Sequence, residues 1–502
     1  MTLALICFIV VCALELFLWL PSLWRWHKLL ANLLGLLVTV SSALLFGFFP
    51  TVWAGILVFF SAYRVINLLR VAEGNSQADY MFTVARRSSF WLISIQIGMA
   101  LLAAAHNLLG LGVLPYLYLL AGLQLVMAVI LYASTRRHLK TSQPPVIEEA
   151  YADRDLPSLT VAIPARNETE DLQQCLESLV ASTYPKLEIL VLDDCSQSRR
   201  TTEIIRDFAQ QGVRFVAGEA PPEEWVAKNY AYQQLTKQAS GELLLFCGVD
   251  TRFEPDSLRV LVETLLTKKK TMLCVIPHNR RQRGSLQSLL VQPGRYAWEL
   301  ALPRRWLERP PVLSTCWLIT AAALHAAGGF KAVSRSHSPE SHFARFTART
   351  SDGYSFVQSS AQIGLSSLKG FSDQRATAIR TRYPQLHRRV ELVGVVSLIE
   401  AASLLAPFGL VIYSVVVENW PLLAVNLVIS ILLAIVYGRI VTLTYRSLVI
   451  WSILVAPFAV LYDIGLLNYS MWQYEFGEVI WKGRNVCIPV MRVIPNLPKR
   501  NQ

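Results

Sequence analysis

The feature of this chain that most constrains its fold is a set of apolar stretches of about 20 residues. A helix of that length crosses a hydrocarbon layer about 30 Å thick. The stretches lie near residues 2–22, 29–48, 51–69, 88–108, 115–135, 394–417, 420–438 and 448–470. The first lacks the basic start and the small-residue cleavage site of a signal peptide. Only 16% of the residues are charged, against about a quarter in soluble proteins. The sequence therefore predicts a multi-pass integral membrane protein, in the cell membrane.

The distribution of basic residues predicts which side of the membrane the central part of the chain occupies. If the first five stretches alternate in direction, one side receives Arg25, Lys28, Arg70, Arg86, Arg87, Arg136, Arg137 and Lys140. The loops on the other side, around 49–50 and 109–114, carry no Lys or Arg. The positive-inside rule then places the central part in the cytoplasm. The net charge of +12 suits contact with an anionic leaflet, and no nucleic-acid partner is expected because the basic residues border the spans.

The C-terminal end breaks this pattern. Three crossings after residue 391 would place Lys482 and Arg484 on the opposite side from the other basic residues. Pro457 and Asp463 interrupt the last apolar stretch, which we therefore expect to re-enter the membrane or to lie in its interface. The basic tail, 473–502, is then expected in the cytoplasm.

Between the two membrane regions, 1–135 and 392–472, a linker at 136–157 leads into a domain of mixed composition at 158–391. Apolar runs near 159–164, 187–192, 213–217, 242–247 and 272–277 alternate with amphipathic segments near 202–211, 228–238 and 255–268. Such alternation predicts an α/β fold with a mainly parallel sheet covered on both faces. Asn167 and Glu170 have the spacing of a capping pair for a further helix. The eight cysteines show no zinc-site or CxxC spacing and are expected to be small buried side chains.

Polar residues follow three of the expected strands. They are Arg166-Asn167-Glu168, Asp193-Asp194 and Asp250. Ligands of open α/β sheets bind beyond the carboxyl ends of the strands, so these side chains are candidates for a binding site. No GxGxxG or GxxxxGK[ST] follows a strand, so neither a dinucleotide site nor a P-loop is predicted.

These residues carry a resemblance. The segments Pro164-Ala165-Arg166-Asn167-Glu168 and Leu192-Asp193-Asp194-Cys195-Ser196, with the strand that leads to Asp250, resemble family 2 glycosyltransferases, which have the Rossmann-like GT-A fold. The segment Trp225–Ala231 is similar to the WxGKxxA motif of a membrane branch that glycosylates lipids such as carotenoids, hopanoids and ceramide-like acceptors. Gly328–Val333 and Trp481-Lys482-Gly483-Arg484 also resemble that branch. The resemblance covers about 158–350 and the tail motif.

The resemblance implies roles for single residues. Asp194 would contact the nucleobase, and Ala165, Arg166 and Glu168 would line the nucleoside pocket. Asp250 would bind a divalent metal, Mg²⁺ or Mn²⁺, that neutralises the departing diphosphate. Each of these aspartates has a structural alternative. Asp193 or Asp194 would cap the helix that follows them, and Asp250 would cap the helix expected near 255–268.

Lys228 is a candidate on its own position as well. It opens a helix, where a cation and helix N–H groups can meet a diphosphate. The resemblance favours this role over that of a solvated lysine.

The chain departs from the family pattern at three places. Gly248 stands where the family has a second metal-binding Asp. Ser341 follows Glu340 where the family has the Asp that deprotonates the acceptor, so either Glu340 takes this role, or the acceptor is already ionised, or catalysis is lost. Arg380 and Arg382 stand in place of a QxxRW motif, and they either clamp a diphosphate or form a basic patch facing the membrane.

The sequence thus predicts an inverting membrane glycosyltransferase that moves a sugar from a nucleotide-diphosphate donor to a lipid or polyprenyl-type acceptor. The alternatives are a nucleotide-binding pseudoenzyme that acts as a scaffold and, less favoured, a transporter. The aromatic and basic segment 283–309 is expected to lie at the lipid surface. Glu15, Arg64, Glu400 and Asp463 lie in or beside apolar stretches, where a charge marks either a pathway or a side chain that snorkels.

Overall fold

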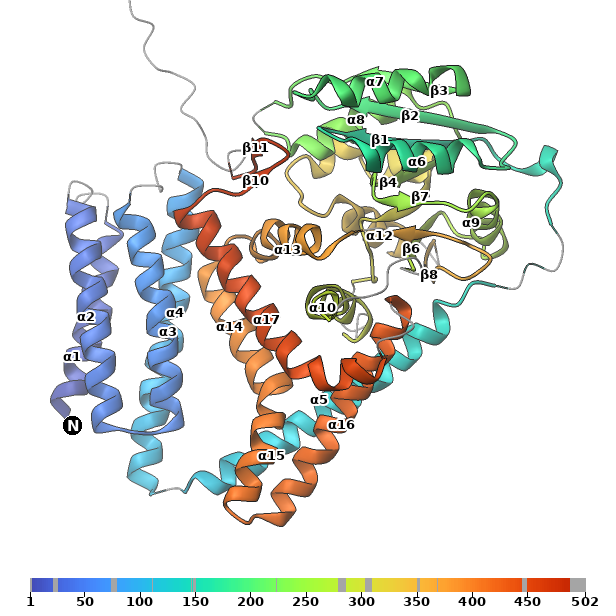
Figure 1. Cartoon of the computed structure of the whole chain (residues 1–502). Coiled ribbons are helices and arrows are strands. Elements are labelled where there is room, and N and C mark those ends of the chain that lie inside the picture. The colour runs from blue at the N-terminus through green and yellow to red at the C-terminus, as the bar shows by residue number, and fades with distance from the viewer. Residues whose placement is uncertain are drawn as a thin grey trace, which may run out of the picture.

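The computed structural model consists of a group of N-terminal helices, a globular α/β domain and a group of C-terminal helices (Figure 1). It describes residues 2–487 except 21–25, 74–78, 111, 146, 148–149, 223, 279–285, 303–308, 350–352, 368 and 445–448. The N-terminal helices are α1 Thr2–Leu18, α2 His27–Phe48, α3 Val52–Ala72, α4 Asp79–Leu109 and α5 Val113–Thr141. The C-terminal helices are α13 Phe371–Gln385, α14 Val390–Glu400, α15 Ala406–Val416, α16 Trp420–Thr444 and α17 Val449–Phe476.

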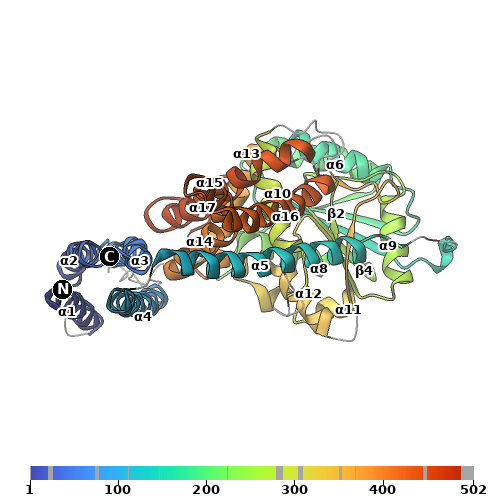
Figure 2. The ribbon, with the colours of Figure 1, turned by 90° about the horizontal axis from the view of Figure 1, so that it is seen from below.

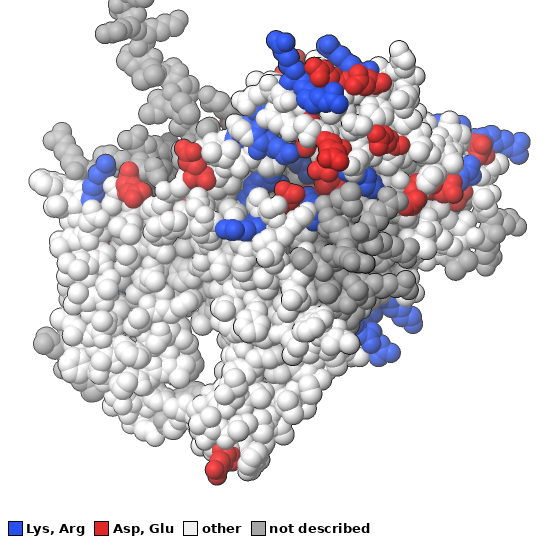
Figure 3. Space-filling view, viewed as in Figure 1, with Lys and Arg blue, Asp and Glu red and all other residues white. Residues whose placement is uncertain are grey.

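Seven helices in the described part of the chain are long and apolar enough to cross a membrane, and α1 is apolar but shorter. Their surfaces carry many exposed large apolar side chains, among them Leu36, Leu119 and Ile453. In Figure 3 the charged side chains gather on the globular domain and along its border with the helices, while the surface of the helices below is almost free of them. This is the surface expected of a protein whose helices lie in lipid.

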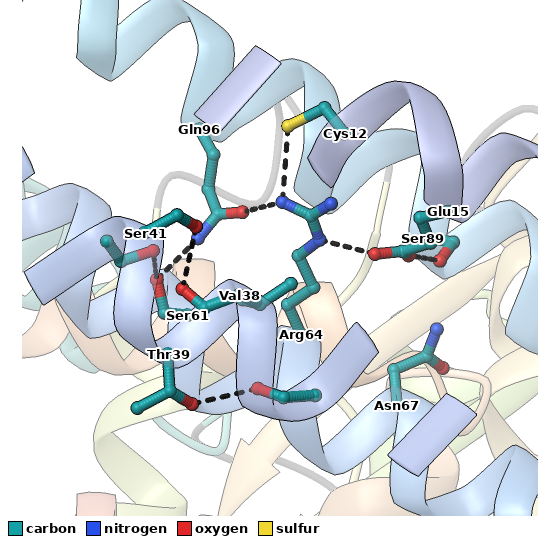
Figure 4. A network of polar contacts seen from close by, with 12 residues as sticks. Cys12, Glu15, Val38, Thr39, Ser41, Ser61, Arg64, Asn67, Ser89 and Gln96 are labelled. Carbon is teal, nitrogen blue, oxygen red and sulfur yellow. Dashed lines mark hydrogen bonds and ion pairs between the residues drawn. The ribbon is translucent and has the colours of Figure 1, made fainter. Parts of the chain in front are cut away.

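The helices α1–α4 enclose a polar network (Figure 4). Arg64 donates from Nε to Glu15 at 2.6 Å and from a terminal nitrogen to Gln96 at 2.7 Å, and both Arg64 and Glu15 are completely buried. Gln96 donates in turn to Ser61. Snorkelling therefore does not account for Glu15 and Arg64, because each satisfies the other inside the bundle.

The sheet of the globular domain has the order β3-β2-β1-β4-β7-β6-β8. Its strands are β1 Leu159–Ala165, β2 Leu187–Asp193, β3 Val213–Ala217, β4 Leu243–Cys247, β6 Met272–Ile276, β7 Cys316–Thr320 and β8 Tyr354–Gln358. All neighbours pair in parallel except β7, which is antiparallel to β4 and β6. The predicted α/β fold with a mainly parallel sheet is confirmed.

Both faces of the sheet are covered because its strands alternate their side chains between two cores. On one face Ala162 and Phe246 pack with α8 Ala227–Gln238, α12 Pro339–Arg349 and residues of α5 and α16. On the other face Val161 and Leu245 pack with α6 Glu170–Val180, α7 Arg199–Asp207 and α9 Ser257–Thr267. The first core thus joins the globular domain to the membrane helices, and Figure 2 shows α5 running from the N-terminal helices to the domain.

The capping pair expected at the start of α6 is wrong. The helix begins at Glu170 after Thr169, with no side-chain cap. The Asn167 side-chain oxygen instead accepts from the backbone N–H groups of Gln197 and Ser198. Asn167 has φ 50°, a conformation that asparagine tolerates, and it ties the loop after β1 to the loop after β2.

The last helix, α17, begins and ends on the side of the globular domain. The ring of His278, just after β6, donates to the Leu443 carbonyl at the end of α16, at 2.6 Å. Past the far end of α17, Lys482 reaches Glu168 of the domain. Both ends of α17 thus lie beside the globular domain, although the helix is long and apolar enough to cross a membrane. The re-entrant or interfacial course of this stretch stays a prediction.

The expected interfacial segment 283–309 is described only in part, since Arg283, Arg304, Arg305 and Trp306 lie outside the described residues. Its helix α10, Ser288–Leu300, packs against α16 and α17. Tyr296 is buried in the core shared with the globular domain. The described part thus lies between the sheet and the C-terminal helices α16 and α17 (Figure 1).

Candidate active site

The loop after β2 separates the two neighbouring aspartates into different environments. Asp193 ends β2 and accepts hydrogen bonds from the Ser196 N–H at 3.0 Å and the Thr202 hydroxyl at 2.6 Å. It therefore holds the turn into α7, which is the structural role expected for one of the pair. Asp194 is left to face the end of β1, where its N–H donates to the Ala165 carbonyl.

Asp194 lies between two arginines. Its carboxylate accepts from Arg484 at 2.6 Å, and its backbone carbonyl accepts from Arg166, also at 2.6 Å. Burial raises the pKa of Asp194 above its ordinary value, although Arg484 and Arg166 pull it down. Burial and the neighbouring Arg484 lower the pKa of Arg166. A buried carboxylate held in this way has a defined direction, as a nucleobase N–H requires.

The arginine that reaches Asp194 belongs to a small hairpin made of β10 Ile480–Trp481 and β11 Arg484–Asn485. Its two-residue turn, Lys482-Gly483, has φ 49° and 76°, as a type I′ turn needs. Lys482 donates from Nζ to Glu168 at 2.8 Å, and its carbonyl accepts from Arg166. Burial raises the pKa of Glu168, and the bond from Lys482 opposes that rise. The tail motif thus closes over the residues expected to frame the nucleoside (Figure 1).

Asp250 follows β4 at the carboxyl edge of the sheet, as the sequence predicts. A second ribbon, β5 Thr251–Arg252 paired with β9 Ser366–Ser367, brings distant residues to it. Ser367 donates to its Oδ2 at 2.8 Å, and Lys369 Nζ lies 3.7 Å from the same oxygen. Burial raises the pKa of Asp250, but Lys369 and Ser367 outweigh burial and leave this pKa below its ordinary value. Asp250 is accordingly ionised at neutral pH.

Gly248 lies two residues before Asp250, and its backbone does not adopt a positive φ. A Cβ added there would meet the Asp250 Oδ1 at 2.5 Å, and no other contact that close is found. The position therefore accepts a side chain if the Asp250 carboxylate turns aside.

A cavity of about 850 Å³ lies between the sheet edge and the helices α10, α12, α13, α14 and α17. Its lining includes Glu340, Ser341 and Lys369. Five Lys or Arg residues line it against two Glu, and three of these cations, Arg335, Lys369 and Arg382, are paired with carboxylates outside the lining. His337 also faces this cavity, and burial lowers its pKa to about 4, which keeps it neutral.

The remaining predicted residues lie around this centre. Lys228 is near the start of α8, with Nζ 5.4 Å from the ring centre of Tyr232, and its charge acts on Asp250. The guanidinium of Arg380 lies over the Trp481 ring of the hairpin at 4.9 Å. Arg382 lines the large cavity but is paired with Asp463 of α17. Diphosphate binding by these three stays a prediction.

The residues near Asp250 bear on the expected metal. No group of three or more His, Cys, Asp or Glu side chains in the described part of the chain could hold a metal ion. Asp250 is a single carboxylate, and Mg²⁺ commonly binds proteins through one or two carboxylates together with substrate phosphates. The site therefore fits Mg²⁺ or Mn²⁺ only as a partner of a bound diphosphate.

Three contributors were missed from the sequence. Ser367 and Lys369 carry no local signal, because they reach Asp250 only through the β5–β9 pairing. Arg484 was part of a recognised motif without an assigned role. The sequence does indicate a hairpin at this place, because Gly483 stands at the second position of a two-residue turn, and Arg484 directly follows that turn.

A mainly parallel sheet with ionisable residues beyond its carboxyl edge is the arrangement with which open α/β domains bind ligands. Residues 160–326 match the family model described as Glycosyl transferase family 2, so this part of the chain is a family 2 glycosyltransferase domain.

Relatives and solved structures with known names are similar to parts of the chain. The glycosyltransferase AglE of Haloferax volcanii is 35% identical over 99 residues, which are 19% of this chain and 31% of that protein. The 4,4'-diaponeurosporenoate glycosyltransferase of Staphylococcus haemolyticus is 27% identical over 144 residues, 28% of this chain and 36% of the relative. The matches thus span about a third of these relatives.

Among solved structures, the mannosyltransferase PcManGT of Pyrobaculum calidifontis, in complex with GDP-Man and Mn²⁺, aligns with a TM-score of 0.46 and 17% identity. The alignment covers 71% of this chain and 98% of that one.

Proposed function

We propose that the protein is a membrane-embedded inverting glycosyltransferase. It moves a sugar from a nucleotide-diphosphate donor to a lipid acceptor at the cytoplasmic face. The observation that carries this proposal is the large cavity, which is lined by Glu340, by Lys369 and by apolar residues of the C-terminal helices. Lys369 connects this cavity to Asp250 at the sheet edge, since its Nζ lies 3.7 Å from the Asp250 carboxylate. A donor from the cytoplasm and an acceptor from the membrane can meet there.

The donor half of the site rests on the loops after β1, β2 and β4. Asp194 is directed by Arg484 and Arg166, and Glu168 lies beside it in the same set of loops. The charges of Lys369 and Lys228 both act on Asp250, so two cations lie near the position proposed for the donor diphosphate. The name of one relative, a 4,4'-diaponeurosporenoate glycosyltransferase, agrees with a sugar donor. The mannosyltransferase structure was solved in complex with GDP-Man and Mn²⁺.

The acceptor half rests on the wall formed by helices. Val291 of α10, Val396 of α14 and Leu467 of α17 line the cavity that also holds Glu340. An acceptor with an apolar chain therefore has a route from the membrane helices to the reacting centre. The name of the relative that glycosylates 4,4'-diaponeurosporenoate supports an acceptor of this kind.

In the transfer step the acceptor oxygen forms a bond to the anomeric carbon of the sugar. The bond from that carbon to the diphosphate oxygen breaks, and its electron pair leaves with the nucleoside diphosphate. A hydroxyl acceptor gives its proton to the Glu340 carboxylate, while an acceptor that is already ionised needs no base. Lys369 and Lys228 stabilise the charge that develops on the leaving group.

Asp250 would hold a divalent metal together with the donor phosphates. Such an ion, when bound, neutralises the departing diphosphate as a Lewis acid. Position 248 carries no second carboxylate. The hydrogen bond from Ser367 orients the Asp250 carboxylate, and Lys369 places a positive charge beside it.

A pseudoenzyme is the second candidate, because Gly248 and Ser341 replace two carboxylates and because Lys482 and Arg484 pair with Glu168 and Asp194. The test uses the full-length protein in lipid nanodiscs with a panel of nucleotide sugars, Mg²⁺ or Mn²⁺, and a membrane lipid extract. We expect lipid-dependent release of nucleoside diphosphate. Nucleotide binding without release under any of these conditions would favour the pseudoenzyme.

A further inference from the structure

A second cavity, apolar and separate from the catalytic one, lies among the membrane helices. Its volume is about 160 Å³. The walls are mostly aliphatic and come from α5, α14, α15, α16, α17, the segment between α14 and α15, and the two residues after α10; they include Leu131, Leu404, Val436, Ile440 and Ala459. An apolar cavity of about 150 Å³ can take up benzene, so this one holds a chain segment of about six carbon atoms.

One carboxyl group faces this apolar space. Glu400, the last residue of α14, is 2% exposed and lines the cavity. Among the described residues, neither of its side-chain oxygens has a hydrogen-bond partner. A buried polar group without a partner costs about 1–3 kcal/mol, which a ligand with a hydrogen-bond donor would recover.

The backbone next to Glu400 departs from a regular helix. Residues Ala401–Leu405 form a π-helical turn, and Pro407 at the start of α15 has no N–H to continue the ladder. The side-chain amide of Gln124 from α5 donates to the Ala402 carbonyl at 2.6 Å and so stabilises the turn. Ser403 of the turn lines the cavity beside Glu400. Single π-helical turns are frequent at functional sites.

The apolar cavity adjoins the catalytic one. Leu302 lines both, and Arg382 of the catalytic cavity is paired with Asp463 of the apolar cavity. On α14, Val396 lines the catalytic cavity and Glu400, about one turn further, the apolar one. The Arg382–Asp463 pair therefore stands at the boundary between the two spaces.

We propose that the apolar cavity is a binding site for the chain of a neutral, hydroxyl-bearing lipid whose hydroxyl donates to Glu400. Resting on the proposed function, this lipid is the acceptor, held in a waiting position below the Arg382–Asp463 pair. Burial selects the head group. The cavity is apolar apart from Ser403 and the carboxyl groups of Glu400 and Asp463, so an ionised phosphate or carboxylate is costly to bury there while a neutral alcohol is not. The acceptor then needs a base, which assigns that role to Glu340.

The test labels the full-length protein in nanodiscs with a long-chain alcohol that carries a diazirine on its chain, and with the fatty acid of the same length. Cross-linked peptides are identified by mass spectrometry. We expect the alcohol to label Ala401–Leu405 and the facing parts of α16 and α17, and the acid to label them much less. Equal labelling by both probes, or labelling elsewhere only, overturns the proposal.

Three variants and a control distinguish the contribution of the Glu400 hydrogen bond to labelling from that of the space in the cavity. Glu400→Leu should lower labelling by the alcohol about fivefold, the scale of one hydrogen bond, whereas Glu400→Gln keeps an accepting oxygen and most of the labelling. Ala459→Trp fills the cavity and should abolish labelling. Glu418→Gln, in the exposed loop between α15 and α16, is the matched control and should change nothing. Unchanged labelling in Glu400→Leu contradicts the proposal.

Misfolding and failure of the proposed function have separate readouts. Replacing a buried carboxyl that lacks a partner by leucine should not lower the unfolding temperature, so a stable Glu400→Leu protein keeps the comparison valid. Nucleotide binding is measured in the same nanodiscs. Donor binding without alcohol labelling overturns only the lipid site, and alcohol labelling without donor binding or transfer overturns the acceptor assignment together with the proposed function.

Discussion

Replacing Gly248 by aspartate should make the stability of the protein depend on divalent metal. The backbone at position 248 accepts a side chain, and the new carboxylate would lie beside that of Asp250. Two unit charges of like sign about 4 Å apart repel by about 4 kcal/mol at an effective dielectric constant of about 20. Lys369, 3.7 Å from the Asp250 carboxylate, offsets part of this repulsion. We therefore expect a net destabilisation of about 2 kcal/mol without metal.

The assay is thermal unfolding of the full-length protein in nanodiscs, followed by tryptophan fluorescence. In chelator, Gly248→Asp should unfold about 4–8 °C below the wild type, the shift that about 2 kcal/mol produces in a domain of this size. Mg²⁺ or Mn²⁺ should restore the variant, because two carboxylates bind the cation without a diphosphate. The wild type should respond to metal only when a nucleotide diphosphate is present.

Gly248→Asn is the matched control, since it makes the same contact with Asp250 without the charge. It should show neither the loss in chelator nor the gain with metal. If Gly248→Asp and Gly248→Asn unfold alike under both conditions, the two side chains do not share a cation site, and the reasoning about Asp250 is wrong.

Further changes test other parts of the structure. Asp194→Ala should weaken nucleotide binding by about 1.5–3 kcal/mol, the scale for a hydrogen bond to a charged group, and calorimetry showing unchanged affinity would leave Asp194 a structural role. Glu340→Gln should lower turnover by about 10²–10⁴ with little effect on donor affinity, and an unaffected rate would indicate an ionised acceptor. Glu475→Ala should destabilise the protein by about 3–5 kcal/mol in thermal unfolding, because it leaves Arg70 and Arg388 buried without their shared carboxylate; a change below about 1 kcal/mol would contradict this. A reporter fused after residue 145 should be active in the cytoplasm, and activity on the other side would exclude access to cytoplasmic donors.

Local patterns in the sequence were sufficient for five of the seven strands of the sheet, β1, β2, β3, β4 and β6, which lie where apolar runs alternate with amphipathic segments; β7 and β8 were missed. The apolar stretches are helical, but α1 is shorter than expected, and α14 and α15 divide the stretch near 394–417. The side chains at the carboxyl edge, Asp194 and Asp250, followed from the rule that parallel strands end together. These features depend on short-range periodicity, which a single sequence displays.

What the sequence could not show depends on contacts between distant segments. Ser367 and Lys369 reach Asp250 through a two-residue ribbon that has no pattern of its own. The pairing of Arg484 with Asp194 joins residues 290 positions apart. The capping pair at Asn167 failed because its side chain bonds across to the next loop, where two backbone donors compete for it.

The charges in the apolar stretches illustrate the same limit. In the sequence, Glu15, Arg64 and Glu400 are all single charged residues within apolar stretches. In the structure, Glu15 and Arg64 form an ion pair, whereas Glu400 faces a cavity. Composition indicates that such residues are costly in a membrane. Only the arrangement of the helices shows which of them already has a partner.

Lipid mass spectrometry is the most direct test of whether this protein glycosylates a membrane lipid. Lipids are compared from cells that lack the gene and from the same cells supplied with the wild type or with Asp250→Asn, which is nearly isosteric. We expect a lipid whose mass is increased by one sugar residue to appear with the wild type and to be absent with Asp250→Asn at equal protein level. Identical lipid profiles in all three strains, or a product that persists with Asp250→Asn, would contradict it.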